Sequence, residues 1–144
     1  MCMTEERFSA WLDAYGEAFE RQDPDAAAGL FTPNATYQWG PFGELLRGPQ
    51  EIRDKWAKWA EASDSQATRL RFEYEVIAVT DEVGIARWIA SCSGFDTVTR
   101  YEGIFEVKLA AADLCSEFRE WWNTKEEPLT VKGDASGDGS PKPG

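Results

Sequence analysis

One short segment of the chain combines an acidic side chain with large aromatic rings: Phe118-Arg119-Glu120-Trp121-Trp122. A β-strand projects alternate side chains to the same face, so Glu120 points into a core if Phe118 and Trp122 do. A carboxyl group held among aromatic rings loses hydration, which favours its neutral form and raises its pKa toward the range useful for acid–base chemistry. Glu120 is therefore the first candidate for proton transfer.

Arg87 is the candidate partner of this carboxyl group. It shares strand parity with Ile85 and Ile89, which predicts that it lies on the apolar side of its strand. Paired with Arg87, Glu120 would stay ionised, as a structural ion pair or as a clamp for a polar group of a ligand; unpaired, it would be an acid–base group. These three roles stay open, and a register shift of one residue would place Arg119 inside instead.

The composition excludes several kinds of chemistry. The 144 residues include no histidine, which rules out Ser-His and Cys-His nucleophile systems and histidine-based metal sites. Fifteen Lys and Arg against 26 Asp and Glu give a net charge of -11, which argues against partners such as nucleic acid or an anionic membrane surface. The carboxylates are scattered along the chain, so we predict no metal site and no cofactor.

The N-terminal segment is acidic and amphipathic, and no apolar run has the length of a signal peptide core or a membrane span. Three cysteines, with no close pair, fit a reducing compartment. We therefore expect a cytoplasmic protein.

The periodicity of apolar residues predicts helices first and then a sheet. Helical spacing predicts three helices, and alternation with period two predicts the strands that follow. Short connections between the last four strands indicate antiparallel pairing. The expected helices cover about 4–21, 24–31 and 48–63, and the expected strands cover 35–39, about 70–76, 83–93, 99–109 and 114–122. From Lys125 the composition changes to Gly, Ser, Pro, Asp and Lys, which predicts a single domain over 1–124 and a flexible low-complexity tail over 125–144.

This order of elements resembles the nuclear transport factor 2-like superfamily, and within it the SnoaL-like family, over roughly residues 6–124. The resemblance implies an α+β fold in which three N-terminal helices pack on a strongly curved, mostly antiparallel sheet, a cone-shaped α+β barrel. It also implies a ligand pocket inside the cone and, frequently, a homodimer. The segments that carry it are Arg21-Gln22-Asp23-Pro24-Asp25, Leu30-Phe31-Thr32-Pro33-Asn34-Ala35-Thr36-Tyr37, Gly48-Pro49-Gln50-Glu51-Ile52 and Phe118-Arg119-Glu120-Trp121-Trp122-Asn123.

Several positions resemble those of enzymes in this superfamily. Tyr15 is similar in placement to the oxyanion-binding tyrosine of steroid isomerases, whereas Trp39 and Phe105 stand where those enzymes carry carboxyl groups. Glu120 is similar to the last-strand acid of epoxide hydrolases and of polyketide cyclases. No complete catalytic set of any of these enzymes is present.

Seven Trp, four Tyr and eight Phe can line an apolar cavity or fill a solid core. The leading prediction is the binding of a small, mostly apolar molecule. The alternatives are an isomerase, cyclase or epoxide hydrolase, with Glu120 as acid/base supported by Arg87 and Tyr15, and a ligand-free scaffold. The predicted ligand-binding walls are Trp39, Trp56, Phe105, Phe118 and Trp122.

Overall fold

A computed structural model describes residues 3–62, 69–94 and 97–128. Three helices precede most of a six-stranded sheet whose strand order is β2-β1-β6-β5-β4-β3. All neighbouring strands are antiparallel except β1 and β6, which are parallel. The elements are α1 (Glu5–Arg21), α2 (Pro24–Ala28), β1 (Phe31–Gln38), β2 (Leu45–Arg47), α3 (Gly48–Ala62), β3 (Arg69–Val79), β4 (Gly84–Ser93), β5 (Thr97–Leu109), a 3₁₀ turn (Ala111–Asp113) and β6 (Cys115–Pro128).

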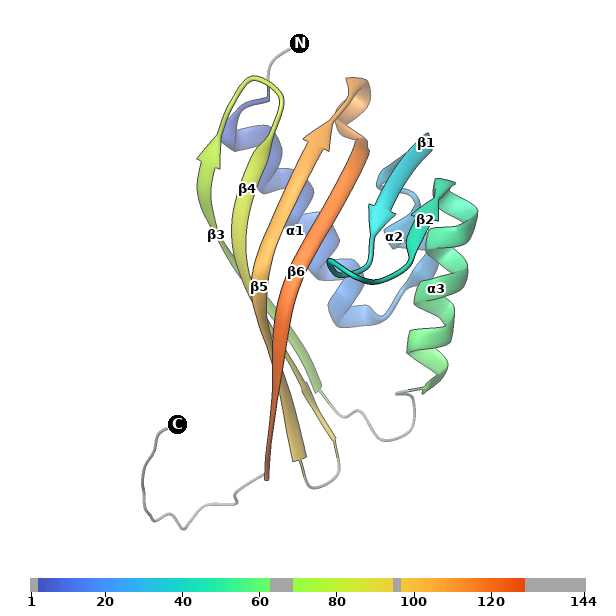
Figure 1. The fold of residues 1–144 in the computed structure, drawn as a ribbon, viewed down its shortest axis with the longest axis vertical. Coiled ribbons are helices and arrows are strands. Elements are labelled where there is room, and N and C mark those ends of the chain that lie inside the picture. The colour runs from blue at the N-terminus through green and yellow to red at the C-terminus, as the bar shows by residue number, and fades with distance from the viewer. Residues whose placement is uncertain (1–2, 63–68, 95–96, 129–144) are drawn as a thin grey trace.

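Helix α1 begins and ends where its local chemistry requires. The Thr4 hydroxyl accepts a hydrogen bond from the Arg7 backbone N–H at 3.1 Å and so satisfies one free amide of the first turn. Gln22, with a φ of 49°, ends the helix. At Gly16, a Cβ would lie 2.5 Å from the Phe72 ring, so the helix approaches β3 closely. This contact fixes α1 across one face of the long strands (Figure 1).

The predicted fold class is confirmed: three N-terminal helices pack on a mostly antiparallel sheet. The sheet is open, because β2 and β3 are its two edges. The short helix α2 packs against α3, and α3 lies beside β1 and β2, at the edge of the sheet opposite β3 (Figure 1).

The predicted ends of α2 and β6 were wrong, and strand β2 was not predicted. Helix α2 ends at Ala28 and not at residue 31, because the Leu30 carbonyl accepts hydrogen bonds from the Cys115 N–H and the Trp11 indole, which starts β1 beside β6. Strand β2 has only three residues, too few for a periodic pattern. Strand β6 pairs with β5 as far as Pro128, so residues 125–128 of the predicted tail belong to the sheet. The rest of that tail, 129–144, lies outside the described residues.

Candidate functional site

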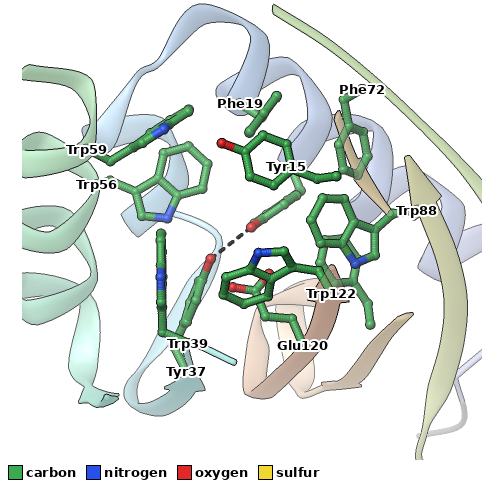
Figure 2. Close-up of a pocket in the computed structure, with 12 residues that line it drawn as sticks. Tyr15, Phe19, Tyr37, Trp39, Trp56, Trp59, Phe72, Trp88, Glu120 and Trp122 are labelled. Carbon is green, nitrogen blue, oxygen red and sulfur yellow. Dashed lines mark hydrogen bonds between the residues drawn. The ribbon is translucent and has the colours of Figure 1, made fainter. Parts of the chain in front are cut away.

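The concave side of the sheet and the helices enclose a cavity of about 240 Å³ (Figure 2). Of the twelve described side chains that line it, eleven are aromatic and the twelfth is Glu120. An apolar cavity of about 150 Å³ holds one benzene ring, so this volume accommodates on the order of ten non-hydrogen atoms. The aromatic lining residues are Tyr15, Phe19, Tyr37, Trp39, Trp56, Trp59, Phe72, Trp88, Tyr101, Phe105 and Trp122.

Secondary-structure periodicity brings these rings together. Tyr15 and Phe19 lie four residues apart on α1, and Trp56 and Trp59 lie three apart on α3, so each pair shares a helix face. The strands contribute alternate residues, such as Glu120 and Trp122 of β6. The floor of the cavity is fully buried, whereas six of the described lining rings are half-buried and define its more open side: Phe19, Trp39, Trp59, Phe72, Tyr101 and Trp122.

Glu120 is the one acidic residue among the described residues of this lining. It is 5% exposed, and β6 places it opposite Phe105 of β5. Within the part of the chain that the structure describes, it forms no hydrogen bond and no ion pair. Burial raises the pKa of Glu120 from its ordinary 4.5 to about 8, because the ionised form loses its hydration. Near neutral pH this carboxyl group can therefore either give or take a proton.

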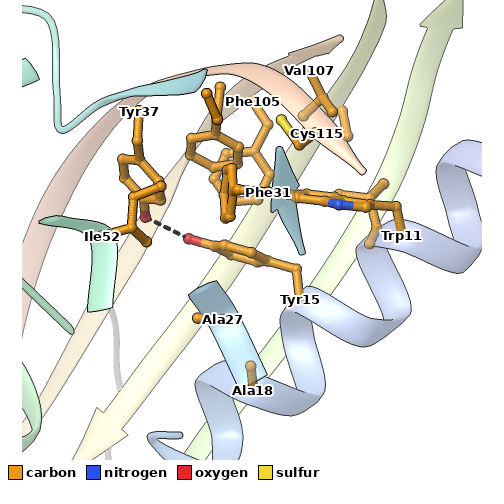
Figure 3. Close-up of a cluster of buried hydrophobic side chains, with 14 of the residues drawn as sticks. Trp11, Tyr15, Ala18, Ala27, Phe31, Tyr37, Ile52, Phe105, Val107 and Cys115 are labelled. Atoms are coloured by element: carbon orange, nitrogen blue, oxygen red, sulfur yellow. Dashed lines mark hydrogen bonds between the residues drawn. The ribbon is translucent and has the colours of Figure 1, made fainter. Parts of the chain in front are cut away.

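Two tyrosines form the polar contact at the floor of the cavity. The hydroxyl oxygens of Tyr15 and Tyr37 are 2.8 Å apart and share a hydrogen bond (Figures 2 and 3). Burial raises the pKa of both phenols well above the ordinary value of 10, and the nearby Glu120 charge raises them further. Both side chains are therefore neutral at physiological pH and hold each other in place.

Two tryptophans of the lining carry buried indole N–H groups, those of Trp56 and Trp88, and neither donates a hydrogen bond to any described residue. By contrast, the Trp11 indole, outside the cavity, donates to the Leu30 carbonyl at 3.0 Å. An unpaired buried donor costs about 1–3 kcal/mol. The cavity wall therefore contains three polar groups without a hydrogen-bond partner among the described residues: Glu120 and these two indoles.

The prediction that Arg87 points inward was wrong. Its guanidinium group lies 2.9 Å from Glu102 and 3.5 Å from Glu75 on the outer face of the sheet. The inner face of β4 carries Ala86, Trp88 and Ala90, and Ile85 and Ile89 lie on the half-buried outer face. Those isoleucines made the outer face look apolar in the sequence. Arg87 therefore cannot pair with Glu120.

The prediction that Phe118 lines the cavity was also wrong. Its side chain is wholly buried in the core beneath the cavity, stacked on Tyr15 with ring centroids 5.3 Å apart, and is not part of the lining. Figure 3 shows this core, which fills the space between α1 and the sheet. The other predicted wall residues, Trp39, Trp56, Phe105 and Trp122, do line the cavity. Tyr15, predicted to support Glu120 in catalysis, also lines it, and Glu120 points inward.

Six lining residues were not predicted as site residues: Phe19, Tyr37, Trp59, Phe72, Trp88 and Tyr101. The sequence contains signals for some of them. Phe19 lies four residues after Tyr15, Trp59 three after Trp56, and Tyr101 four before Phe105 on one strand, so each shares a face with a predicted wall residue.

No group of three or more His, Cys, Asp or Glu side chains within residues 3–62, 69–94 and 97–128 is arranged to hold a metal ion. None of the helices in these ranges combines the length and the apolar character needed to cross a bilayer.

The model of the SnoaL-like domain family matches residues 12–123. The chain therefore belongs to the SnoaL-like family, and its fold is that of the nuclear transport factor 2-like proteins. No curated protein matches the chain in sequence.

Three similar solved structures illustrate how widely this fold is shared. The first is the epoxide hydrolase/cyclase-like enzyme SalBIII of pyran ring formation in salinomycin, with a TM-score of 0.67 and 18% identity over 84% of this chain and 95% of that one. RV0760c from Mycobacterium tuberculosis has a TM-score of 0.68 and 12% identity over 87% and 99%. An LEH-like epoxide hydrolase from M. tuberculosis has a TM-score of 0.61 and 8% identity over 82% and 84%. At these identities the likeness shows the fold alone.

Proposed function

We propose that the protein binds a small, mostly apolar molecule in the cavity of Figure 2. The observation that carries this proposal is a cavity of about 240 Å³ walled by eleven aromatic rings. A ligand that buries about 200 Å² of apolar surface there gains on the order of 5 kcal/mol before the cost of association. The half-buried rings at the open side give such a molecule a way in.

Apolar ring compounds should therefore stabilise the protein against heat. Neopentylbenzene or naphthalene at about one hundred times its Kd should add about 2.7 kcal/mol, which raises Tm by several degrees. Trp39→Ala should lose most of this shift because it opens the wall of the cavity. Trp121→Ala is the matched control, since that indole lies on the outer face beside Arg119. Differential scanning fluorimetry measures the shift, and a broad set of ring compounds without any effect would favour the ligand-free scaffold.

A second candidate function is acid–base catalysis, and the environment of Glu120 favours it. A carboxyl group with a pKa of about 8 exists in both protonation states near neutral pH, as a general acid or base must. The charge of Glu120 raises the pKa of Tyr15 and of Tyr37, so both phenols lie close to this carboxyl group. SalBIII is described as an epoxide hydrolase/cyclase-like enzyme and the M. tuberculosis protein as an LEH-like epoxide hydrolase, so the shared fold can accommodate enzyme chemistry.

Proton transfer by Glu120 should appear as hydrogen exchange on a ring ketone. In deuterated buffer near pH 8, wild-type protein should speed deuterium incorporation at the carbon next to the carbonyl of 1-indanone by 100-fold or more. Glu120→Gln should return the rate to that of buffer, and Glu117→Gln, which alters a carboxyl paired with Lys108, should keep the wild-type rate. NMR follows the exchange; equal rates for wild type and Glu120→Gln would rule out this role.

The sequence led us to expect a homodimer and a cytoplasmic location, and both stay predictions. The outer face of the sheet alternates half-buried apolar side chains, such as Ile104 and Trp121, with ion pairs such as Arg87–Glu102. Such a mixed face supports contact with a second copy of the chain.

A further inference from the structure

The lining of the cavity carries one acidic group and no basic group. Glu120 stands among eleven aromatic side chains, and no Lys, Arg, Asn or Gln of the described residues lines the space. A buried carboxylate is normally paired or hydrogen-bonded, because the loss of its hydration is costly. In this cavity no described residue provides that partner, which indicates that a ligand supplies it.

The groups around Glu120 come from several elements, and none of them is a cation. Helix α1 contributes Tyr15 and strand β1 contributes Tyr37, whose hydroxyls are bonded to each other. Strand β5 contributes Phe105 opposite Glu120 and Tyr101 further along, and α3, β3 and β4 contribute only aromatic rings. The pKa of Tyr101 is raised to about 12, and those of Tyr15 and Tyr37 are raised as well. Glu120 is therefore the lining group that titrates between about pH 6 and pH 9.

Two basic side chains, one adjacent to Glu120 in sequence and one in contact with a lining ring, are paired with other groups. Arg119, next in sequence, lies over the outer Trp121 ring and within 3.7 Å of Glu106. Lys55 lies over the Trp39 ring, 5.3 Å from its centroid, and pairs with Glu44 at 3.1 Å. Trp39 thus already binds a cation through its π-system.

The walls suit a positively charged ligand better than one that only accepts hydrogen bonds. The faces of Trp, Tyr and Phe rings carry negative charge density and attract ammonium groups, by about 2 kcal/mol or more when water is excluded. The unpaired indole N–H groups of Trp56 and Trp88 can donate to an acceptor group of a ligand, but they do not carry the positive charge that an ionised Glu120 requires. An anion would meet the charge of Glu120 and the net charge of -11.

We propose that this pocket binds a small organic cation, a quaternary or protonated amine on an apolar body, with the Glu120 carboxylate as its counter-ion. This inference rests on the proposed binding function and specifies its ligand. The apolar body stacks on the aromatic walls, and the ammonium group replaces the missing basic side chain next to Glu120. The cavity volume of about 240 Å³ suits a single ring with a substituted amine.

The charge of the ligand sets the direction of the pH dependence. Because the pKa of free Glu120 is about 8, the group is mostly neutral at pH 6, and binding a permanent cation must release its proton. Affinity should therefore rise about tenfold per pH unit from pH 6 to pH 8 and level off above. A ligand that accepts a hydrogen bond from the neutral carboxyl group would show the opposite dependence, with its affinity falling above pH 8.

The test compares two compounds of the same shape: benzyltrimethylammonium, a permanent cation, and neopentylbenzene, its neutral carbon analogue. Isothermal titration calorimetry at about pH 8.5 should give at least tenfold tighter binding for the cation. Glu120→Gln should reduce this preference to less than about threefold, and Glu117→Gln should preserve it. The rise of the affinity for benzyltrimethylammonium with pH in wild-type protein tests the role of Glu120 as counter-ion without any substitution.

The outcomes separate this inference from the function on which it rests. If neither compound binds, the proposed function itself fails. If neopentylbenzene binds as tightly as the cation, the pocket takes apolar molecules but the assignment of a cation is overturned. A preference for the cation that survives in Glu120→Gln, or an affinity that falls as the pH rises above 8, would overturn the role of Glu120 as counter-ion.

Discussion

Glu120→Gln should make the ligand-free protein progressively more stable than wild type as the pH rises, by roughly 4 kcal/mol between about pH 5 and pH 9. The physical reason is that Glu120 is buried without a protein partner among the described residues, and its pKa lies near 8 in the folded state against an ordinary 4.5. Glutamine has nearly the same shape and cannot ionise. Few single substitutions change stability by this much.

The sign follows from proton binding. Between about pH 4.5 and pH 8 the folded protein holds a proton on Glu120 that the unfolded chain has released. The free energy of unfolding therefore decreases as the pH rises. The stabilising contribution of the neutral carboxyl group is fully present below pH 4.5 and is lost as the pH rises through 8. The glutamine side chain adds a constant effect of its own, so the change of the difference with pH is the quantity to measure.

Urea unfolding at about pH 5, 7 and 9 provides this measurement. The free energy of unfolding should diverge between wild type and Glu120→Gln as the pH rises. The matched control is Glu117→Gln on the same strand, whose carboxyl is partly exposed and pairs with Lys108; its difference from wild type should stay within about 0.5 kcal/mol over this range. A difference for Glu120→Gln that does not change with pH would show that this carboxyl group is solvated.

The elements of the fold could be predicted because most of them have one buried face and one solvent-exposed face. Helix α1 and strand β3 follow clean periods of 3.6 and two residues, and both were predicted nearly to their ends. The short β2 was not predicted, because three residues carry no period and its pairing with β1 is set by the turn between them. The continuation of β6 to Pro128 was hidden by a polar composition that tertiary pairing with β5 overrides.

The candidate site was only partly predictable. Glu120 could be assigned an inward direction because Phe118 and Trp122 flank it at period two. Arg87 was assigned wrongly because β4 has an inner face of Ala86, Trp88 and Ala90 and an outer face that contains isoleucines, so hydrophobicity alone did not mark the inside. Whether the rings leave a cavity depends on how far α1 and α3 lie from the inner face of the sheet, and no local pattern encodes that spacing.

The polar groups of the cavity indicate a balance between stability and binding. A protein selected for stability alone would pair the Glu120 carboxyl and the two buried indoles, since each costs free energy when left without a partner. Residues that break the rules of packing tend to occur at functional sites. The unpaired carboxyl is therefore better explained by a ligand than by the needs of the fold.

Gly103→Ala should destabilise the protein by about 3 kcal/mol or more, because the added methyl group has no room. Gly103 lies in β5 opposite Trp122, and a Cβ built there would stand 1.7 Å from the Trp121 carbonyl oxygen. The obstacle is backbone, so β5 and β6 must separate. The same pair of strands carries Tyr101, Phe105, Glu120 and Trp122 into the cavity, and ligand binding should weaken with the loss of stability.

Thermal unfolding measures this effect, and Gly29→Ala is its control. At Gly29 the chain has an ordinary φ of -68° and a Cβ would lie 3.4 Å from the Asp25 carbonyl oxygen, an ordinary contact. That substitution should be neutral or stabilising by about 0.4–1 kcal/mol, because it restricts the unfolded chain. The same chemical change should thus lower Tm by roughly 10 °C at Gly103 and leave it unchanged or slightly raised at Gly29. Similar Tm values for the two variants would mean that β5 and β6 can separate at Gly103 without a loss of stability. The close approach of the two strands would then not be what fixes the wall of the cavity.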